Sequence, residues 1–182
     1  TAAELAYEIL IENDGNNFIY APLVNYADHT FGVCKKMLDD KNAIMGLGDG
    51  GAHVGFILDA GYPTWLISYW SVKQKAYSME ETVRRLTSDT ANAAGLNDRG
   101  LLKVGLKADI NIIDWENVGS SDPFMTQDLP AGGKRLMQHT KGYVTTIVSG
   151  VVTYKNGKFT KERPGTVVKS VKDEEKTLEF IN

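Results

Sequence analysis

The stretch that decides the predicted fold reads AIMGLGDGGAH and covers residues 43–53. Residues 43–48 are apolar or glycine, carry no charge and show no helical stagger, which is typical of a strand buried on both faces of a parallel sheet or barrel. In barrel enzymes the reactive groups sit where strands run out into loops, because the strand fixes a side chain that the loop leaves reachable. Asp49 follows this strand among three glycines, which let substrate or backbone approach closely. Asp49 is therefore a candidate catalytic residue, and the alternative is that Asp49-Gly50 forms only a turn.

Composition bounds the class of protein. The chain has 182 residues, of which 42% are hydrophobic and 24% charged, as in a globular protein with one core or a core and a smaller lobe. A net charge of -3 without a basic cluster argues against a nucleic-acid partner. No apolar run reaches the roughly 20 residues that cross a bilayer, so we expect no membrane association and a cytoplasmic location. Cys34 is the one cysteine, which fits a reducing compartment. We expect it to lie on a helix and to face the core of the protein.

The first half of the chain predicts alternating helices and strands. A capping box that opens at Thr1 starts a helix over about residues 2–12. A strand over 18–24, a helix over 28–38 and the strand over 43–48 follow with short links. This recurrence is the signature of a parallel unit. Because the chain opens directly on a secondary-structure element and not on Met, we expect it to be cut from a longer protein.

Two further helices are predicted before the pattern changes. The first begins at Pro63 and carries a stripe of aromatic side chains at helical spacing, which favours packing over a stacking platform for bases or sugars. The second begins at Ser78, where a second capping box is expected, and ends at Gly95. Arg84 and Arg85 on this helix are expected to lie on a solvated face.

The second half of the chain predicts short antiparallel strands. They are expected over residues 108–114, 144–148, 151–154 and 158–160, because apolar residues alternate there and Ser-Gly and Asn-Gly pairs separate the last three strands. Residues 115–142 are expected to be mostly irregular.

Three motifs in this order resemble one enzyme family. They are GDGGAH at residues 48–53, GLLKVGLKADINIID at 100–114 and VSGVVTY at 148–154. Together they resemble the C-terminal part of an amidohydrolase-superfamily enzyme, specifically of the N-acyl-D-amino-acid deacylase (D-aminoacylase) branch. Residues 128–133 and 163–165 are also similar to that branch.

The resemblance implies an α/β plus β fold. Residues 1–98 would form the last strands and helices of a (β/α)₈ barrel, residues 99–170 part of a small β-sandwich lobe, and residues 171–182 a charged tail. It further implies a zinc-dependent hydrolase that cleaves a C–N bond in a small-molecule N-acyl amino acid or related amide. Asp49 matches the aspartate that takes a proton from the zinc-bound water and passes it to the leaving nitrogen. The physical chemistry agrees, since an amine leaves only with a positioned proton donor.

Two positions near Asp49 bear on the substrate. His53 resembles a loop histidine that lies near substrate in family members, and the alternative is that it only anchors the loop by a hydrogen bond. D-aminoacylases carry a His-Pro-Arg whose arginine resembles a clamp for the substrate carboxylate, whereas the nearest match here is Tyr-Pro-Thr at residues 62–64. The bidentate donor is thus missing, which argues against D-amino-acid specificity.

Metal ligands are sparse in this sequence. The histidines are His29, His53 and His139, and none is paired with another at ligand spacing. A catalytic zinc needs about three protein ligands, and Asp49 is the one further candidate. We therefore expect that zinc belongs to the longer parent protein and that this chain alone binds no metal and is inactive. We also expect self-association, because the barrel faces that would meet missing strands must be covered.

Two other classes fit the same motifs. One is a non-catalytic scaffold that kept the amidohydrolase fold and lost its chemistry. The other is a cyclic amidase similar to hydantoinases or dihydroorotases, which also keeps the aspartate after the eighth strand.

Overall fold

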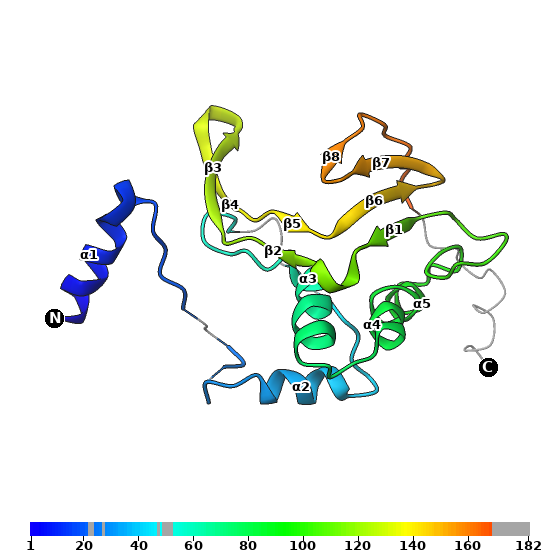
Figure 1. Cartoon of the computed structure of the whole chain (residues 1–182), viewed down its shortest axis with the longest axis horizontal. Coiled ribbons are helices and arrows are strands. Elements are labelled where there is room, and N and C mark those ends of the chain that lie inside the picture. Colours follow the sequence, from blue (N-terminus) through cyan, green and yellow to red (C-terminus); the bar gives the residue numbers. More distant parts are fainter. Residues whose placement is uncertain (22–23, 27, 47, 49–52, 169–182) are drawn as a thin grey trace, which may run out of the picture. The chain divides into compact units, whose positions relative to one another are not determined.

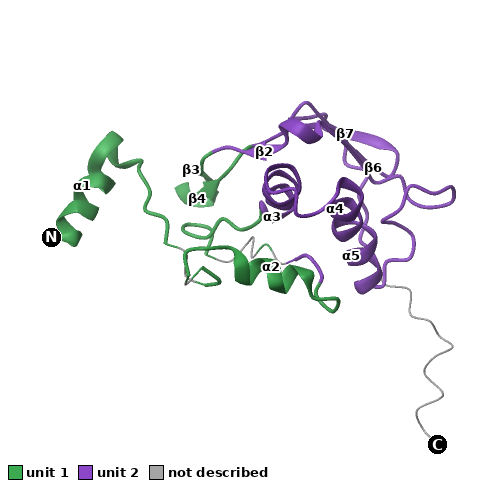
Figure 2. Ribbon diagram, turned by 60° about the horizontal axis from the view of Figure 1, so that its bottom comes forward, with its two compact units in different colours: residues 1–43, 47–60, 122–139 green, residues 44–46, 61–121, 140–182 purple. Residues whose placement is uncertain are grey.

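The computed structural model describes residues 1–21, 24–26, 28–46, 48 and 53–168 (Figure 1). The chain divides into two compact units (Figure 2). Unit 1 comprises residues 1–43, 47–60 and 122–139, and unit 2 comprises residues 44–46, 61–121 and 140–182. The predicted charged tail at 171–182 lies outside the described residues. The predicted boundary between residues 98 and 99 stays a prediction.

Unit 1 begins with helix α1, Ala2–Gly15. The predicted capping box at its start is confirmed, because the Glu4 amide donates to Thr1 Oγ1 at 3.2 Å and the Thr1 amino group bonds Glu4 Oε2 at 2.6 Å. Helical backbone angles end at Glu12, where ψ is 158°, as the sequence predicted.

Helix α2, Gly32–Asp39, begins four residues later than predicted. The residues before it form local side-chain turns, in which Asp28 accepts from the Thr30 amide at 3.1 Å and from its hydroxyl at 2.8 Å. Such bonds compete with helix formation. No residue of α2 is buried, and Cys34 is half-exposed with its thiol 3.5 Å from the Asn25 carbonyl oxygen, so its predicted place in the core was wrong.

The two strands predicted in the first half of the chain are not formed at the residues that the structure describes. For the first predicted strand these are residues 18–21 and 24, and for the second they are residues 43–46 and 48. A strand needs a hydrogen-bonded neighbour, and the ladders among the described residues all lie between residues 110 and 159. All of these ladders are antiparallel, whereas the strands of a (β/α)₈ barrel are parallel. The partial barrel and the sandwich lobe therefore stay predictions.

Unit 1 also contains a hairpin that the sequence analysis missed. Strand β3, Phe124–Leu129, pairs with β4, Gly133–Met137, across a 3₁₀ turn, η3, Pro130–Gly132. The expectation that residues 115–142 are irregular was therefore wrong. Ala131 and Gly132 both have left-handed backbones, with φ of 57° and 73°, and this reverses the chain at the tip.

The helices of unit 2 follow the sequence prediction closely. Helix α3, Tyr62–Trp65, continues as a π-helix, η1, Leu66–Lys73, and α4, Met79–Leu86, is followed by α5, Ser88–Ala93. Ser78 caps α4 by accepting from the Glu81 amide at 3.1 Å. The last predicted helix is broken at Thr87, whose φ and ψ are -124° and -86°. Gly95 follows α5 with a φ of 69°, as a helix-ending glycine does.

The β-strands of unit 2 form a four-stranded antiparallel sheet and a short ladder. The sheet has the order β1-β6-β7-β8, with bounds Ile110–Ile113, Tyr143–Val148, Val151–Lys155 and Lys158–Phe159. The short ladder joins β2, Gly119–Ser120, to β5, Thr140–Lys141, and a 3₁₀ turn, η2, Trp115–Asn117, precedes it.

Both predicted hairpins of the sheet are confirmed. Each turn places two residues at positive φ, with 50° and 82° at Ser149 and Gly150, and 49° and 73° at Asn156 and Gly157. This is the turn geometry that matches the twist of adjoining strands.

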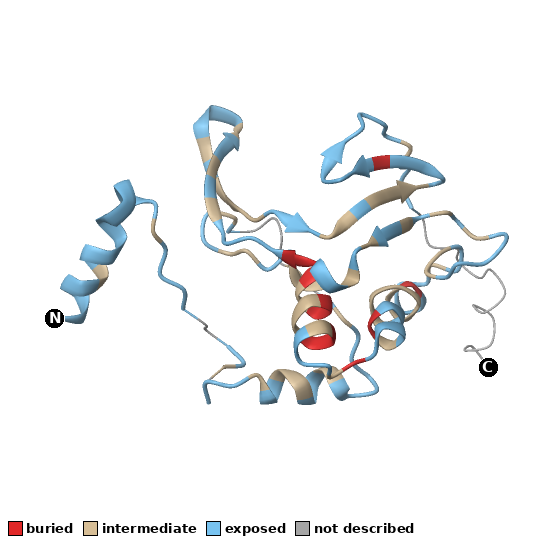
Figure 3. Ribbon diagram, viewed as in Figure 1, coloured by how far each residue is buried: buried red, intermediate tan, exposed pale blue. Residues whose placement is uncertain are grey.

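The buried residues of the described chain all lie in unit 2 (Figure 3). Leu66 and Thr82 are completely buried, and Trp70 and Tyr77 nearly so. The aromatic stripe packs as predicted, with the Trp65 and Tyr69 rings stacked 4.7 Å apart and both edge-on to Trp70.

The prediction that both arginines of α4 lie on a solvated face holds for Arg84 and fails for Arg85. The Arg84 side chain is 55% exposed, whereas that of Arg85 is 18% exposed. Arg85 pairs with Glu81 at 2.8 Å and lies 4.5 Å from the Tyr77 ring centre. A guanidinium can occupy this half-buried place because it stacks on an aromatic face while its donors stay paired.

Helix length and polarity bear on the membrane prediction. No helix formed by the described residues is long and apolar enough to cross a bilayer.

Candidate functional site

The predicted catalytic residue, Asp49, lies outside the described residues. His53 is the first residue that the structure describes after it, and its side chain is exposed. The His53 backbone is left-handed, with φ of 54°, and its carbonyl oxygen accepts from the amides of Phe56 and Ile57 at 2.9 and 3.0 Å. The His53 ring lies 5.1 Å from the Phe56 ring. We call residues 53–57 the His53 turn, a closed turn that begins four residues after Asp49 in the chain.

The His53 turn is bonded to the hairpin of unit 1. The Leu136 amide of β4 donates to the Val54 carbonyl oxygen at 2.7 Å. Leu136 is opposite Met125 in the ladder with β3, and an amide that bonds outside the ladder points away from the partner strand. Strand β4 therefore has β3 on one edge and the His53 turn on the other (Figure 1).

An ion pair closes the same hairpin near its tip. Arg135 Nε and Nη2 donate to the two carboxylate oxygens of Asp128 at 2.7 and 2.6 Å, which is the bidentate arrangement. Both side chains are part-exposed, at 35% for Arg135 and 45% for Asp128. The hydrogen bonds from the guanidinium lower the pKa of the Asp128 carboxyl, and the carboxylate raises the pKa of Arg135.

An aromatic contact joins the two strands at the open end of the hairpin. Phe124 begins β3 and His139 follows β4, and their ring centres are 4.7 Å apart. His139 is exposed and has further interactions. Its contact with Phe124 gives it a role in holding the hairpin together.

The described residues do not fit a zinc ion. They contain no group of three histidine, cysteine, aspartate or glutamate side chains close enough to hold a metal. His29 lies edge-on to Tyr26, with ring centres 6.0 Å apart, and His53 and His139 contact Phe56 and Phe124. No step of the proposed chemistry is therefore assigned to a metal held by these residues.

The residue at the expected place of the arginine clamp is structural. Thr64 is 4% exposed and its hydroxyl lies 2.9 Å from the Tyr143 hydroxyl within unit 2. Its side chain is thus committed to joining α3 to β6. It offers no charged donor to a substrate carboxylate, in agreement with the sequence analysis.

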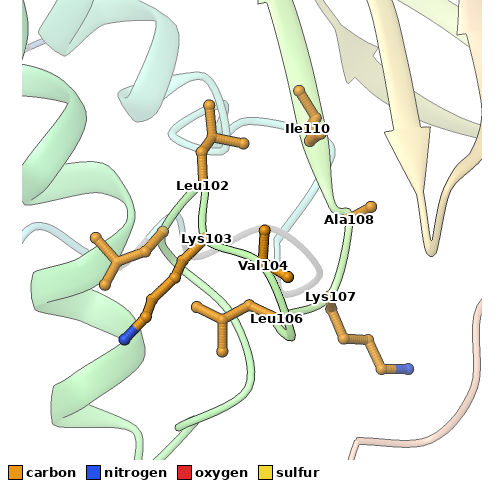
Figure 4. A pocket seen from close by; sticks show the side chains of 8 residues that line it. Leu102, Lys103, Val104, Leu106, Lys107, Ala108 and Ile110 are labelled. Carbon is orange, nitrogen blue, oxygen red and sulfur yellow. The ribbon is translucent and has the colours of Figure 1, made fainter.

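Unit 2 carries a small apolar pocket of about 280 Å³ (Figure 4). The loop from Leu101 to Ala108 and the first residue of β1, Ile110, line it, and the ammonium groups of Lys103 and Lys107 point away from it. Of the lining side chains, Leu102 is 84% exposed and Val104 fully exposed. His53, the predicted site residue that the structure describes, is not among the residues that line this pocket.

Sequence reasoning missed the part that Arg135 plays and the bond from Leu136 to Val54. One signal for the hairpin was present, since Pro130 to Gly133 is a turn sequence. No local pattern indicates which amide bonds the His53 turn, because the two segments are far apart in the sequence.

Comparisons with known proteins bear on the identity of the chain. No curated protein and no solved structure matches the chain. Residues 21–154 match the model of the Amidohydrolase family, and this span contains Asp49, the His53 turn and the hairpin of β3 and β4. Since the match covers well over half of the sequence, the chain belongs to the amidohydrolase family of hydrolases.

Proposed function

We propose that this chain contributes to hydrolysis of a C–N bond in an N-acyl amino acid or a related amide, with Asp49 as the proton carrier. The observation that carries the proposal is the family match, which spans the sequence GDGGAH at residues 48–53. An amine is a poor leaving group until it is protonated, so amide hydrolysis needs a residue that moves a proton from the attacking water to nitrogen. The glycines around Asp49 leave room for an amide to approach its carboxylate.

Zinc is the metal that the resemblance implies, and when bound it would activate water as a nucleophile. The described residues do not supply its ligands. This chain's own residues then have two roles. Asp49 transfers the proton, and His53, which follows in an exposed turn, lies near the substrate.

A non-catalytic scaffold is the second candidate. It is favoured by one observation, namely that the described residues hold no set of three metal-ligating side chains. A scaffold would keep the fold of the family and would not depend on the Asp49 carboxylate.

An activity assay separates the two candidates. The polypeptide encoded by the complete reading frame that contains residues 1–182 is assayed with zinc on a panel of N-acyl amino acids and cyclic amides. Asp49→Asn is expected to lower kcat at least about 100-fold, because it removes a proton carrier and keeps the shape. Asp59→Asn is the matched control, since Asp59 is an exposed aspartate in the same loop region, and its kcat should stay within about twofold.

The outcomes of this assay are distinct. Turnover that survives Asp49→Asn would contradict the role of Asp49. Absence of turnover on the whole panel would favour the scaffold. Turnover on cyclic amides alone would assign a cyclic amidase in place of an N-acyl amino-acid deacylase.

We also propose that residues 1–182 self-associate. Helix α1 supports this, because its side chains Leu5, Tyr7 and Ile11 are 58%, 65% and 54% exposed. Light scattering at micromolar concentration should give a mass above that of the monomer, and Leu5→Ser with Ile11→Ser should lower it. Glu8→Ser, on the same helix, is the control, and a monomeric wild-type chain would overturn the proposal.

A further inference from the structure

We propose that Arg135 is a positioning residue for the site: its ion pair with Asp128 sets the register of β4, and the register decides whether the Leu136 amide holds the His53 turn. The inference rests on the proposed function for the placement of His53 near substrate. The coupling between the ion pair and the His53 turn stands on the geometry of unit 1 alone.

The ion pair lies where the ladder itself is interrupted. Thr126 is opposite Arg135 and Leu129 is opposite Gly133, so β3 contributes two residues between these pairs, Gln127 and Asp128, and β4 contributes one. This is a β-bulge, at which the backbone ladder leaves one residue unpaired. The fork from Arg135 to both oxygens of Asp128 joins the two strands at this irregular place.

Register matters here because successive residues of a strand point their amides to opposite edges. With Arg135 opposite Thr126, the Leu136 amide points away from β3 and meets the Val54 carbonyl at 2.7 Å. A slip of one residue would turn this amide toward β3 and remove the bond to Val54. A bidentate ion pair tolerates no such slip, since the fork geometry fixes both distance and direction.

The His53 turn transmits the position of Val54 to His53. The His53 carbonyl accepts two backbone bonds and its ring contacts Phe56, so the turn is closed on itself. Val54 is the next residue in the chain, and its bond to Leu136 attaches this closed turn to β4. A change in the register of β4 therefore moves His53 as part of one rigid turn.

Amide hydrogen exchange by NMR on residues 1–182 tests the coupling directly. Arg135→Met keeps a long side chain and removes the fork, and we expect the Leu136 amide to exchange about tenfold faster, as a protecting bond weakens. Arg135→Lys keeps the charge without the fork and should recover part of the protection. Exchanging the partners, Asp128→Arg with Arg135→Asp, should restore it to within about threefold of wild type.

Lys134→Met is the matched control. Lys134 is the exposed neighbour on β4, so its loss removes a positive charge without touching the fork. Unchanged Leu136 exchange in Arg135→Met, or an equal acceleration in Lys134→Met, would overturn the inference. A shift of the His53 ring proton resonances in Arg135→Met, reversed in the exchanged pair, would support transmission to His53, and its absence would contradict it.

The same variants in the complete polypeptide separate this inference from the proposed function. Arg135→Met should raise KM about tenfold and change kcat less than about threefold, because His53 lies near substrate and Asp49 carries the proton. If exchange is coupled as expected and no hydrolysis is found, the proposed function fails and the positioning role stands. If hydrolysis depends on Asp49 but the exchange rate of the Leu136 amide is the same in Arg135→Met as in wild type, the positioning role fails and the proposed function stands.

Discussion

Gly142→Ala gives the sharpest test of how unit 2 is packed. A Cβ at Gly142 would lie 2.6 Å from the Cα of Val118, 2.9 Å from its nitrogen and 3.0 Å from its Cβ. Two of these atoms belong to the backbone, so a side-chain rotation cannot relieve the contact. Gly142 also has φ of 86°, a conformation that alanine adopts at a cost of roughly 1–2 kcal/mol.

The clash adds to this strain. Val118 is 6% exposed, and shifting buried neighbours to admit a methyl group costs about 1–3 kcal/mol. The Gly142 carbonyl accepts from the Asp114 amide at 2.7 Å, and a shift would strain that bond as well. We expect a loss of about 2–5 kcal/mol in the free energy of unfolding, from the strain and the overpacking together.

Gly150→Ala is the matched control. Gly150 has a similar φ of 82°, and a Cβ there would meet nothing within 4 Å, so only the strain of roughly 1–2 kcal/mol remains. The assay is urea unfolding followed by tryptophan fluorescence, because Trp65, Trp70 and Trp115 all lie in unit 2. Equal losses of unfolding free energy in the two variants would refute the close contact between Gly142 and Val118.

Three further predictions concern burial, capping and pH. Leu66→Ala should lower the unfolding free energy by about 2–5 kcal/mol, because Leu66 is fully buried, whereas an equal result for the exposed Leu102→Ala would contradict this core. Ser78→Ala should cost about 1 kcal/mol by urea unfolding, since the Glu81 amide loses its acceptor, and Ser78→Asn should keep most of it. Because Arg135 lowers the pKa of Asp128, the ion pair stabilises the hairpin above about pH 3.9, where an unfolded aspartate is also ionised, and loses this effect as pH falls through the folded pKa. Leu136 protection factors in wild type should therefore approach those of Arg135→Met as pH falls below the folded pKa of Asp128, and a pH-independent difference would contradict the role of the carboxylate.

The sequence predicted the elements whose cause is local. Turn pairs such as Asn156-Gly157 fix both their own backbone and the register of the strands beside them, and this is why β6, β7 and β8 were found. The helix caps at Thr1 and Ser78 were found for the same reason, since each bond spans three residues.

Elements whose cause is distant were missed or wrong. Residues 43–46 are apolar as a buried strand would be, yet a strand requires a neighbour that no local pattern names. The hairpin of β3 and β4 was missed because its ladder is interrupted by a bulge, across which Asp128 and Arg135 pair. The apolar alternation within it is weak.

The candidate site likewise has a part that local sequence could predict and a part that it could not. Asp49 could be named from its glycine-rich surroundings and from the family that they resemble, and its role stays a prediction. The attachment of the His53 turn to β4 could not be named, because it depends on one bond between backbone groups, which every residue carries.

The location of all the indole rings in unit 2 has a practical consequence for anyone who handles this protein. Tryptophan fluorescence will report the thermal unfolding of unit 2, which holds the buried core. It will not report the unfolding of unit 1, which carries His53. Tyr7, Tyr20 and Tyr26 lie in unit 1 and the other five tyrosines in unit 2, so thermal scans should also be recorded at a wavelength that detects tyrosine, and two midpoints should be sought before one Tm is assigned.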